Sequence, residues 1–149
     1  MEDDKILYVG VSGYFDQKFD EEEARELLED ALEDIEKEYL DSGEYDDIII
    51  VSGLTNYGMP KVAYQVADYK GYGTMGIAPQ EVNDTGYELY PVDEIIYSGE
   101  SFGDEIERYI ETIDVFVRVG GGAQTQMELE LAEEEDISVI EYDLESFQD

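Results

Sequence analysis

Three short turns that carry glycines together with hydroxyl or amide side chains are the segments best suited to bind a ligand. The most informative of them lies within the stretch V-R-V-G-G-G-A-Q-T-Q-M-E, Val117 to Glu128. Consecutive glycines let backbone amides approach a ligand closely, and a following helix directs the positive end of its dipole at the same place. This segment is therefore predicted to bind an anion such as a phosphate. A purely structural tight turn is the alternative.

Each of the three turns follows a predicted strand and contributes candidate ligand contacts. These candidates are Ser12 and Gly13 in the first turn, Ser52, Gly53, Thr55 and Asn56 in the second, and Gly120, Gly121, Gly122, Gln124 and Thr125 in the third. The hydroxyl and amide groups of Thr125 and Gln124 could cap the next helix, contact a phosphate, or do both.

Two charged residues close to the third turn have more than one interpretation. Glu128 lies in the first turns of the predicted helix, where it could catalyse or line a site, although the helix dipole favours a carboxylate there in any case. Arg118 directly precedes the glycines, and we favour an ion pair over a ligand contact for it.

Apolar runs and helical periodicity predict the elements that position these turns. Strands are expected over residues 5–11, 47–52, 73–78, 94–97, 113–119 and 138–142, and helices over 20–40, from about 60, over 103–112 and over 123–135. Strands that alternate with helices indicate an α/β fold, a Rossmann-like three-layer sandwich with a mostly parallel sheet and helices on both faces. The 149 residues suit a single domain over 1–149. Ligands of such sheets bind beyond the carboxyl ends of the strands, where the three turns lie.

The charge of the chain limits its environment and its partners. There are 8 basic and 41 acidic residues, and the net charge is −33. Such self-repulsion opposes compaction in dilute buffer, which indicates a protein from a halophile with a salt-rich cytoplasm, the alternative being an acidic mesophilic or phage protein. A surface this negative repels phosphate backbones and anionic lipid, so we expect neither a nucleic acid nor a membrane as partner.

The absence of cysteine and histidine from the sequence restricts the chemistry further. Disulfides, thiolate catalysis and cysteine zinc sites are excluded, and so is a histidine base or metal ligand. No metal site is predicted, although a divalent cation could accompany a bound phosphate. The N-terminal stretch lacks the pattern of a signal peptide and no apolar run approaches eighteen residues, so a cytoplasmic protein is expected.

The third turn resembles the P-G-G-x-G-T-x-x-E motif of the SLOG superfamily. This superfamily includes the LOG phosphoribohydrolases, formerly called lysine-decarboxylase-like proteins, and molybdenum-cofactor-carrier-like proteins. The matching residues are Gly121, Gly122, Thr125 and Glu128, whereas Gly120 replaces the proline and Gln124 the later glycine. Upstream, S-G-L-T-N-Y-G-M-P (52–60) is similar to a variant, one residue longer, of the second glycine-rich loop, and 9–13 lies where the first nucleotide-contacting turn would be.

This resemblance implies a Rossmann-like domain that binds a nucleotide with its phosphate on the turn 120–125. In the hydrolase branch, the glutamate matched by Glu128 and an arginine on the preceding helix act on the N-glycosidic bond of a nucleoside monophosphate. The only arginine on that helix is Arg108, and its spacing departs from the hydrolase pattern. The resemblance also implies a homo-oligomer, a dimer or larger.

Three functions remain open from the sequence. The first is a SLOG-type sensor or carrier that binds a nucleotide or another phosphorylated small molecule. The second is a LOG-type hydrolase of nucleoside 5′-monophosphates, with Glu128 and Arg108 as catalytic residues. The third is a non-catalytic oligomeric interaction subunit whose glycine turns are structural.

We predict that the thermal stability of the protein rises with salt concentration. Molar salt shortens the screening length to about 3 Å and so relieves the mutual repulsion of the surface carboxylates. Circular dichroism melts from low to multimolar potassium chloride measure this effect. A midpoint that stays flat or falls would contradict adaptation to high salt.

Overall fold

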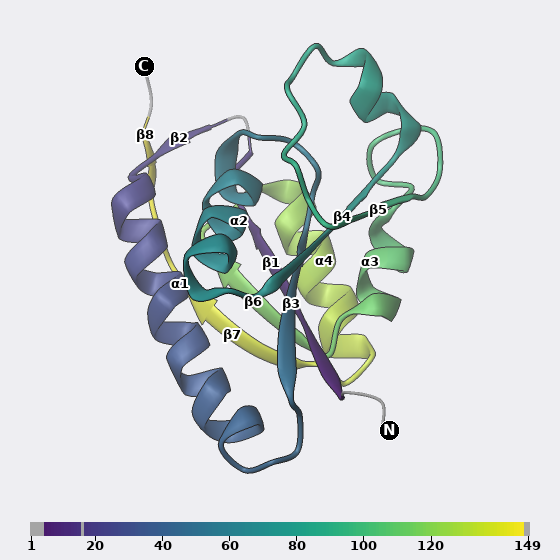
Figure 1. Ribbon diagram of the computed structural model, residues 1–149. Coiled ribbons are helices and arrows are strands. Elements are labelled where there is room, and N and C mark those ends of the chain that lie inside the picture. The colour runs from purple at the N-terminus through teal and green to yellow at the C-terminus, as the bar shows by residue number, and fades with distance from the viewer. Residues whose placement is uncertain (1–4, 16, 148–149) are drawn as a thin grey trace.

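A parallel sheet of six strands forms the centre of the fold in the computed structural model, which describes residues 5–15 and 17–147 (Figure 1). The strand order is β5-β4-β3-β1-β6-β7. The strand bounds are β1 (Ile6–Gly13), β3 (Asp47–Ser52), β4 (Gly73–Ala78), β5 (Glu94–Tyr97), β6 (Val115–Val119) and β7 (Ser138–Tyr142). The chain adds strands outward from β1 to β5 and then returns to the other side of β1. The strand order therefore reverses between β1 and β6.

Helices cover both faces of this sheet and make the three layers that the sequence predicted. One apolar core joins β1 to α1 (Glu21–Ile35) and α2 (Gly58–Lys70), with Val9 and Leu28 among its fully buried members. A second core lies on the other face, where Phe116 of β6 packs with Tyr109 of α3 (Ile106–Thr112) and Leu129 of α4 (Ala123–Glu134). The expected Rossmann-like α/β architecture is confirmed.

Local sequence signals explain how these helices begin and end. The carboxylate of Asp20 accepts a hydrogen bond from the backbone N–H of Glu23 at 3.1 Å, which caps α1. The predicted helix 20–40 continues past α1 as a π-helical segment, η1 (Glu36–Leu40). The helix expected near Pro60 begins two residues earlier, at Gly58, and ends at Gly71 in a left-handed conformation.

Several boundaries differ from the sequence prediction. Strand β1 continues through Ser12 and Gly13, which were expected in a turn, because both residues still pair with β6 opposite Arg118 and Val119. Helix α3 starts three residues later than predicted and β6 two residues later. The prediction missed the short helix η2 (Gln80–Asp84) and the antiparallel pair β2 (Lys18–Phe19) and β8 (Ser146–Phe147), which are too short to show a period. No helix in the described part of the chain is long and apolar enough to cross a membrane.

The hydroxyl group of Tyr64 on α2 links the carboxyl end of β3 to the middle of β4. The side chain is fully buried, and its oxygen accepts a hydrogen bond from the N–H of Ser52 at 3.0 Å. The same hydroxyl lies 2.6 Å from the carbonyl oxygen of Gly53 and 2.8 Å from that of Met75, and it can donate its proton to either. One side chain thus contacts backbone groups of two neighbouring strands.

We expect Tyr64→Phe to lower the free energy of unfolding by about 1–3 kcal/mol, because it leaves these buried backbone groups without their partner. Urea denaturation in molar salt measures the change. Tyr69→Phe on the same helix serves as the control, since Tyr69 is 80% exposed and its hydroxyl should contribute almost nothing. Equal stability of the two variants would contradict the assignment.

Candidate functional site

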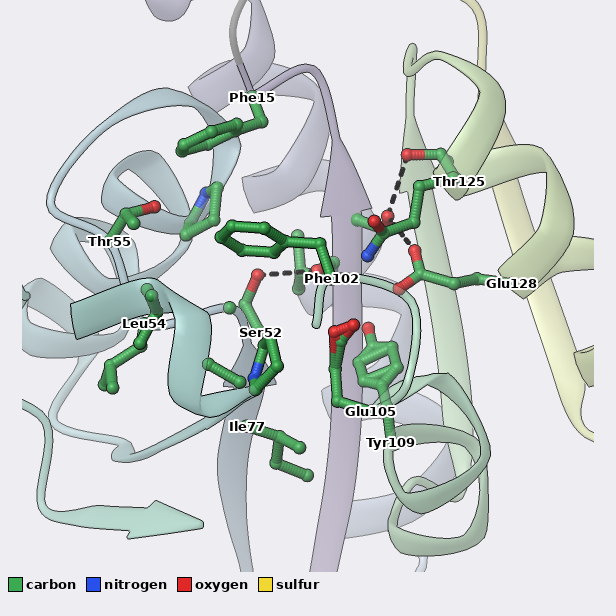
Figure 2. A pocket seen from close by; sticks show the side chains of 18 of the residues that line it. Phe15, Ser52, Leu54, Thr55, Ile77, Phe102, Glu105, Tyr109, Thr125 and Glu128 are labelled. Atoms are coloured by element: carbon green, nitrogen blue, oxygen red, sulfur yellow. Dashed lines mark hydrogen bonds between the residues drawn. The ribbon is translucent and has the colours of Figure 1, made fainter. Parts of the chain in front are cut away.

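A cavity of about 150 Å³ lies beyond the carboxyl ends of β1, β3 and β4 (Figure 2). The start of α4 and the segment that leads into α3 close its other sides. Because α4 follows β6, the cavity is next to the point where the strand order reverses, which is the predicted position of the site.

The structure brings together eight of the predicted site residues in the lining of this cavity. They are Ser12 and Gly13 at the end of β1, Ser52, Gly53 and Thr55 at the end of β3, and Gln124, Thr125 and Glu128 on α4. Asn56 does not line the cavity, and its backbone N–H donates to the carbonyl oxygen of Glu88 at 2.8 Å.

The three consecutive glycines do not line the cavity, and two of them have a structural explanation. The N–H of Gly120 donates to the carbonyl oxygen of Tyr142 at 2.9 Å, and an added Cβ would lie 2.6 Å from the ring of Tyr14. Gly121 has a φ of 112°, and its Cβ would lie 2.6 Å from the side chain of Thr125. Only Gly122, the N-cap of α4, has open space around an added Cβ. The phosphate contact expected at these glycines stays a prediction.

Neither of the two arginines considered from the sequence lies in the cavity. Arg108 is exposed on α3 and lines no part of it, so the structure does not pair it with Glu128. The guanidinium of Arg118 donates to Glu141 at 2.9 Å, to Asp143 at 2.8 Å and to the carbonyl oxygen of Gly120 at 3.0 Å. Arg118 thus has the ion-pairing role that we favoured.

Hydrogen bonds between β1 and α4 hold the carboxylate of Glu128 at the wall of the cavity. The hydroxyl of Ser12 donates to its Oε1 at 2.5 Å and lies 2.9 Å from the hydroxyl of Thr125. The hydroxyl oxygen of Thr125 in turn lies 3.2 Å from the carbonyl oxygen of Gly13, to which it can donate. These contacts join the last two residues of β1 to the first turns of α4 (Figure 2).

Burial makes Glu128 an unusual acid. Its side chain is 7% exposed, and removal from water raises its pKa to about 7. The hydrogen bond from Ser12 opposes this rise, and the negative charge of Glu105 adds to it. A carboxyl group of this pKa changes its charge near neutral pH and can both release and accept a proton there.

Two further polar residues of the cavity, Glu105 and Tyr109, were missed from the sequence. Glu105 is 5% exposed, burial raises its pKa, and one of its oxygens accepts the N–H of Gly103 at 2.7 Å. Tyr109 is 4% exposed, and burial together with the charge of Glu128 raises the pKa of its phenol. Glu105 and Tyr109 are four residues apart, with the apolar Ile106 between them. This spacing was the signal in the sequence that the two side chains share one helical face.

The remaining walls of the cavity are apolar and include side chains from loops. Leu54, Ile77 and Val82 are buried, while Phe15 and Phe102 lie near the opening, with Phe102 44% exposed (Figure 2). Among the described residues, no lysine or arginine lines the cavity. The arrangement suits a flat apolar group whose edge carries hydrogen-bond donors.

We expect the charge of Glu128 to make the protein less stable as the pH rises from about 4.5 to about 7. The native state keeps its proton over this interval while the unfolded chain has lost it, so the free energy of unfolding decreases by about 3 kcal/mol. Glu128→Gln should remove this decrease and be more stable than the parent above pH 7. Urea denaturation between pH 5 and pH 8 in molar salt tests this.

Glu130→Gln is the matched control, because Glu130 is exposed on the same helix. The free energy of unfolding of Glu130→Gln should change with pH as that of the parent protein does. A pH dependence that is identical in Glu128→Gln and Glu130→Gln would refute the buried-acid assignment.

Comparison with solved structures shows a known fold. The molybdenum cofactor carrier protein from Chlamydomonas reinhardtii matches with a TM-score of 0.65 and 23% identity, over 92% of this chain and 76% of that chain. The molybdenum cofactor binding protein from the phototrophic bacterium Rippkaea orientalis matches with a TM-score of 0.64 and 23% identity, over 95% and 77% of the two chains. A structural genomics target designated TM1055 gives a TM-score of 0.66 and 20% identity, over 89% and 72%.

No protein-family model matches the sequence, and no curated protein is a significant match to it. The comparison with known proteins therefore rests on structural similarity alone. The chain has the Rossmann-like fold of molybdenum cofactor carrier proteins, and its resemblance to the SLOG superfamily predicted a fold of this kind.

Proposed function

We propose that this protein binds a phosphorylated small molecule with a planar heterocycle, a nucleotide or a phosphorylated pterin, and carries or senses it without converting it. The observation that supports this most strongly is the cavity itself. It lies at the reversal of strand order, has apolar walls with a few convergent polar groups, and opens beside the N-terminus of α4. Proteins of the same fold carry or bind the molybdenum cofactor, which contains such a pterin.

The size of the cavity limits how much of the ligand it encloses. Its volume of about 150 Å³ equals that of an engineered cavity that accommodates benzene, and pockets that enclose whole drug-sized ligands measure about 300–1,000 Å³. The heterocycle can therefore enter, while the sugar or side chain and the phosphate must lie outside. The first turn of α4 is adjacent, since Gln124 and Thr125 line the cavity.

The phosphate of the proposed ligand would bind at the N-terminus of α4. The first four N–H groups of a helix have no acceptor within the helix, and the dipole adds a partial positive charge. A divalent cation that arrives with the phosphate would offset repulsion from Glu128. The described residues contain no group of three acidic side chains that could hold a metal by themselves, so this cation would depend on the ligand.

Hydrolysis of a nucleoside monophosphate is the second candidate function, and the pKa of Glu128 favours it. A carboxyl group with a pKa of about 7 has the value that suits a general acid or base near neutral pH. The position of Arg108 outside the cavity opposes this candidate, because the second catalytic group of the hydrolase branch is then missing. Incubation with AMP, GMP, CMP and UMP, followed by chromatography of the free bases, separates the two functions.

The proposed setting is the cytoplasm of a salt-rich cell, with the chain in a homo-oligomer, a dimer or larger. Met127 of α4 supports self-association, since this apolar side chain is 56% exposed beside the site. Sedimentation velocity in molar potassium chloride measures the oligomeric state. A homo-oligomer that binds none of the ligands below would favour the interaction subunit instead.

We expect Gly122→Val to weaken binding of phosphorylated ligands by about tenfold or more, because the valine side chain occupies the approach to the α4 amides. Its backbone conformation and the open space around it allow this change without a clash inside the protein. Calorimetric titration in molar salt with GMP, AMP and a phosphorylated pterin, each paired with its unphosphorylated form, measures the effect.

The unphosphorylated forms provide the control, since their weaker affinity should be the same for the parent and for Gly122→Val. If Gly122→Val lowered the affinity for both forms equally, the phosphate would have to bind elsewhere. Failure of every compound to bind the parent protein would refute the proposed function.

A further inference from the structure

The hydroxyl group of Tyr109 is buried in the cavity wall without a hydrogen-bond partner. It is the single side-chain polar atom in the described part of the chain for which burial is complete and no partner exists. A buried hydroxyl left unpaired costs about 1–3 kcal/mol elsewhere in proteins, so its retention calls for a reason. Because Tyr109 lines the cavity, a ligand atom is the available partner.

Glu105 presents a carboxylate with further acceptor capacity on the same side of the cavity. It precedes Tyr109 by four residues, and the backbone N–H of Tyr109 donates to its carbonyl oxygen at 2.9 Å, so both side chains share one helical face. The N–H of Gly103 is bound to Oε1 of Glu105, and no ion pair to a lysine or arginine is found for Glu105 within the described residues. The backbone N–H groups of Gly103 and of Glu105 itself act on this carboxylate. A carboxylate has about four acceptor sites, so about two remain for a ligand.

The two residues together offer a defined hydrogen-bonding pattern. The side chains of Glu105 and Tyr109 lie next to each other in the cavity (Figure 2). The carboxylate can accept two parallel N–H bonds, and the phenol can donate one O–H bond. A 2-amino-4-oxopyrimidine edge has the complementary set, with an amino group and a ring N–H as donors beside a carbonyl oxygen as acceptor. Guanine and pterins both carry this edge.

We infer that the cavity selects heterocycles with a 2-amino-4-oxopyrimidine edge, which Glu105 and Tyr109 recognise together. This inference rests on the proposed function and specifies its ligand class. Adenine does not fit, because the lone pair of its ring nitrogen would face the carboxylate and its edge has no carbonyl to accept from Tyr109. The apolar Leu54 and Ile77 cover other walls of the cavity, where they can contact a flat ring.

Calorimetric titration with GMP, IMP, AMP and 6-hydroxymethylpterin in molar salt tests this selection. The three nucleotides share one sugar phosphate, so their differences report the edge alone. GMP should bind about tenfold or more tightly than IMP, which lacks the amino group, and AMP should bind more weakly still. The pterin, which has the same edge but no phosphate, should compete with GMP for the cavity.

Glu105→Gln and Glu111→Gln form the matched pair of variants for this test. Both changes remove one charge from the region of α3, but Glu111 is exposed and does not line the cavity. Glu105→Gln should reduce the preference for GMP over AMP by about tenfold or more, because an amide replaces one acceptor by a donor. Glu111→Gln should leave the preference unchanged.

Tyr109→Phe separates recognition from a structural role. It removes only the hydroxyl, so the ligand-free protein should melt at the same or a higher temperature, while GMP should bind about tenfold more weakly. A lower melting temperature with unchanged GMP affinity would assign the hydroxyl to the fold and overturn the inference. Equal affinities of the parent protein for GMP, IMP and AMP would overturn it as well, but would leave the proposed function intact. Absence of binding by all four compounds would overturn both.

Discussion

The parallel pairing of β1 with β3 on one side and with β6 on the other is the constraint on which the site depends. A strand that runs parallel to both neighbours ends at the same edge of the sheet as they do, so the residues that follow all three strands meet there. Because β3 and β6 lie on opposite sides of β1, the loop that follows β3 and the helix α4 that follows β6 are on opposite sides of the end of β1. Ser12 and Gly13, at the end of β1, lie between these two segments and contact α4 directly.

The negative charge of the protein limits which groups can bind a ligand at this edge of the sheet. With a net charge of −33 and no cationic side chain among the described residues of the cavity, an anionic ligand cannot be held by lysine or arginine there. Backbone amides at the N-terminus of α4 avoid this difficulty, because they supply donors without adding a mobile charge. The buried carboxylates of Glu105 and Glu128 are better suited to the neutral part of a ligand that donates hydrogen bonds. An acidic protein can thus bind both ends of a phosphorylated heterocycle through different groups.

The sequence predicted the sheet, both helical layers and eight of the lining residues, because apolar periodicity and strand-to-turn transitions are local signals. It proposed Gly120 and Gly121 as ligand contacts, and the structure gives each a steric reason to be glycine, since Tyr14 and Thr125 occupy the space that a side chain would need. The contact of Gly120 with Tyr14 comes from packing between distant segments, and no local pattern reports such packing. Glu105 was missed because only the tertiary fold shows that the segment before α3 closes the cavity.

The hydroxyl groups between β1 and α4 couple the charge of Glu128 to the backbone of β1. Ser12 and Thr125 each have one proton to donate, and their oxygens lie 2.9 Å apart. When Glu128 is ionised, Ser12 donates to it, and Thr125 can donate either to Ser12 or to the carbonyl oxygen of Gly13. When Glu128 is protonated, it can donate to Ser12, Ser12 to Thr125 and Thr125 to Gly13, so that every group in the series is satisfied. Protonation of Glu128 therefore completes the hydrogen bonding at the end of β1, and ionisation leaves one acceptor there for a donor group of a ligand.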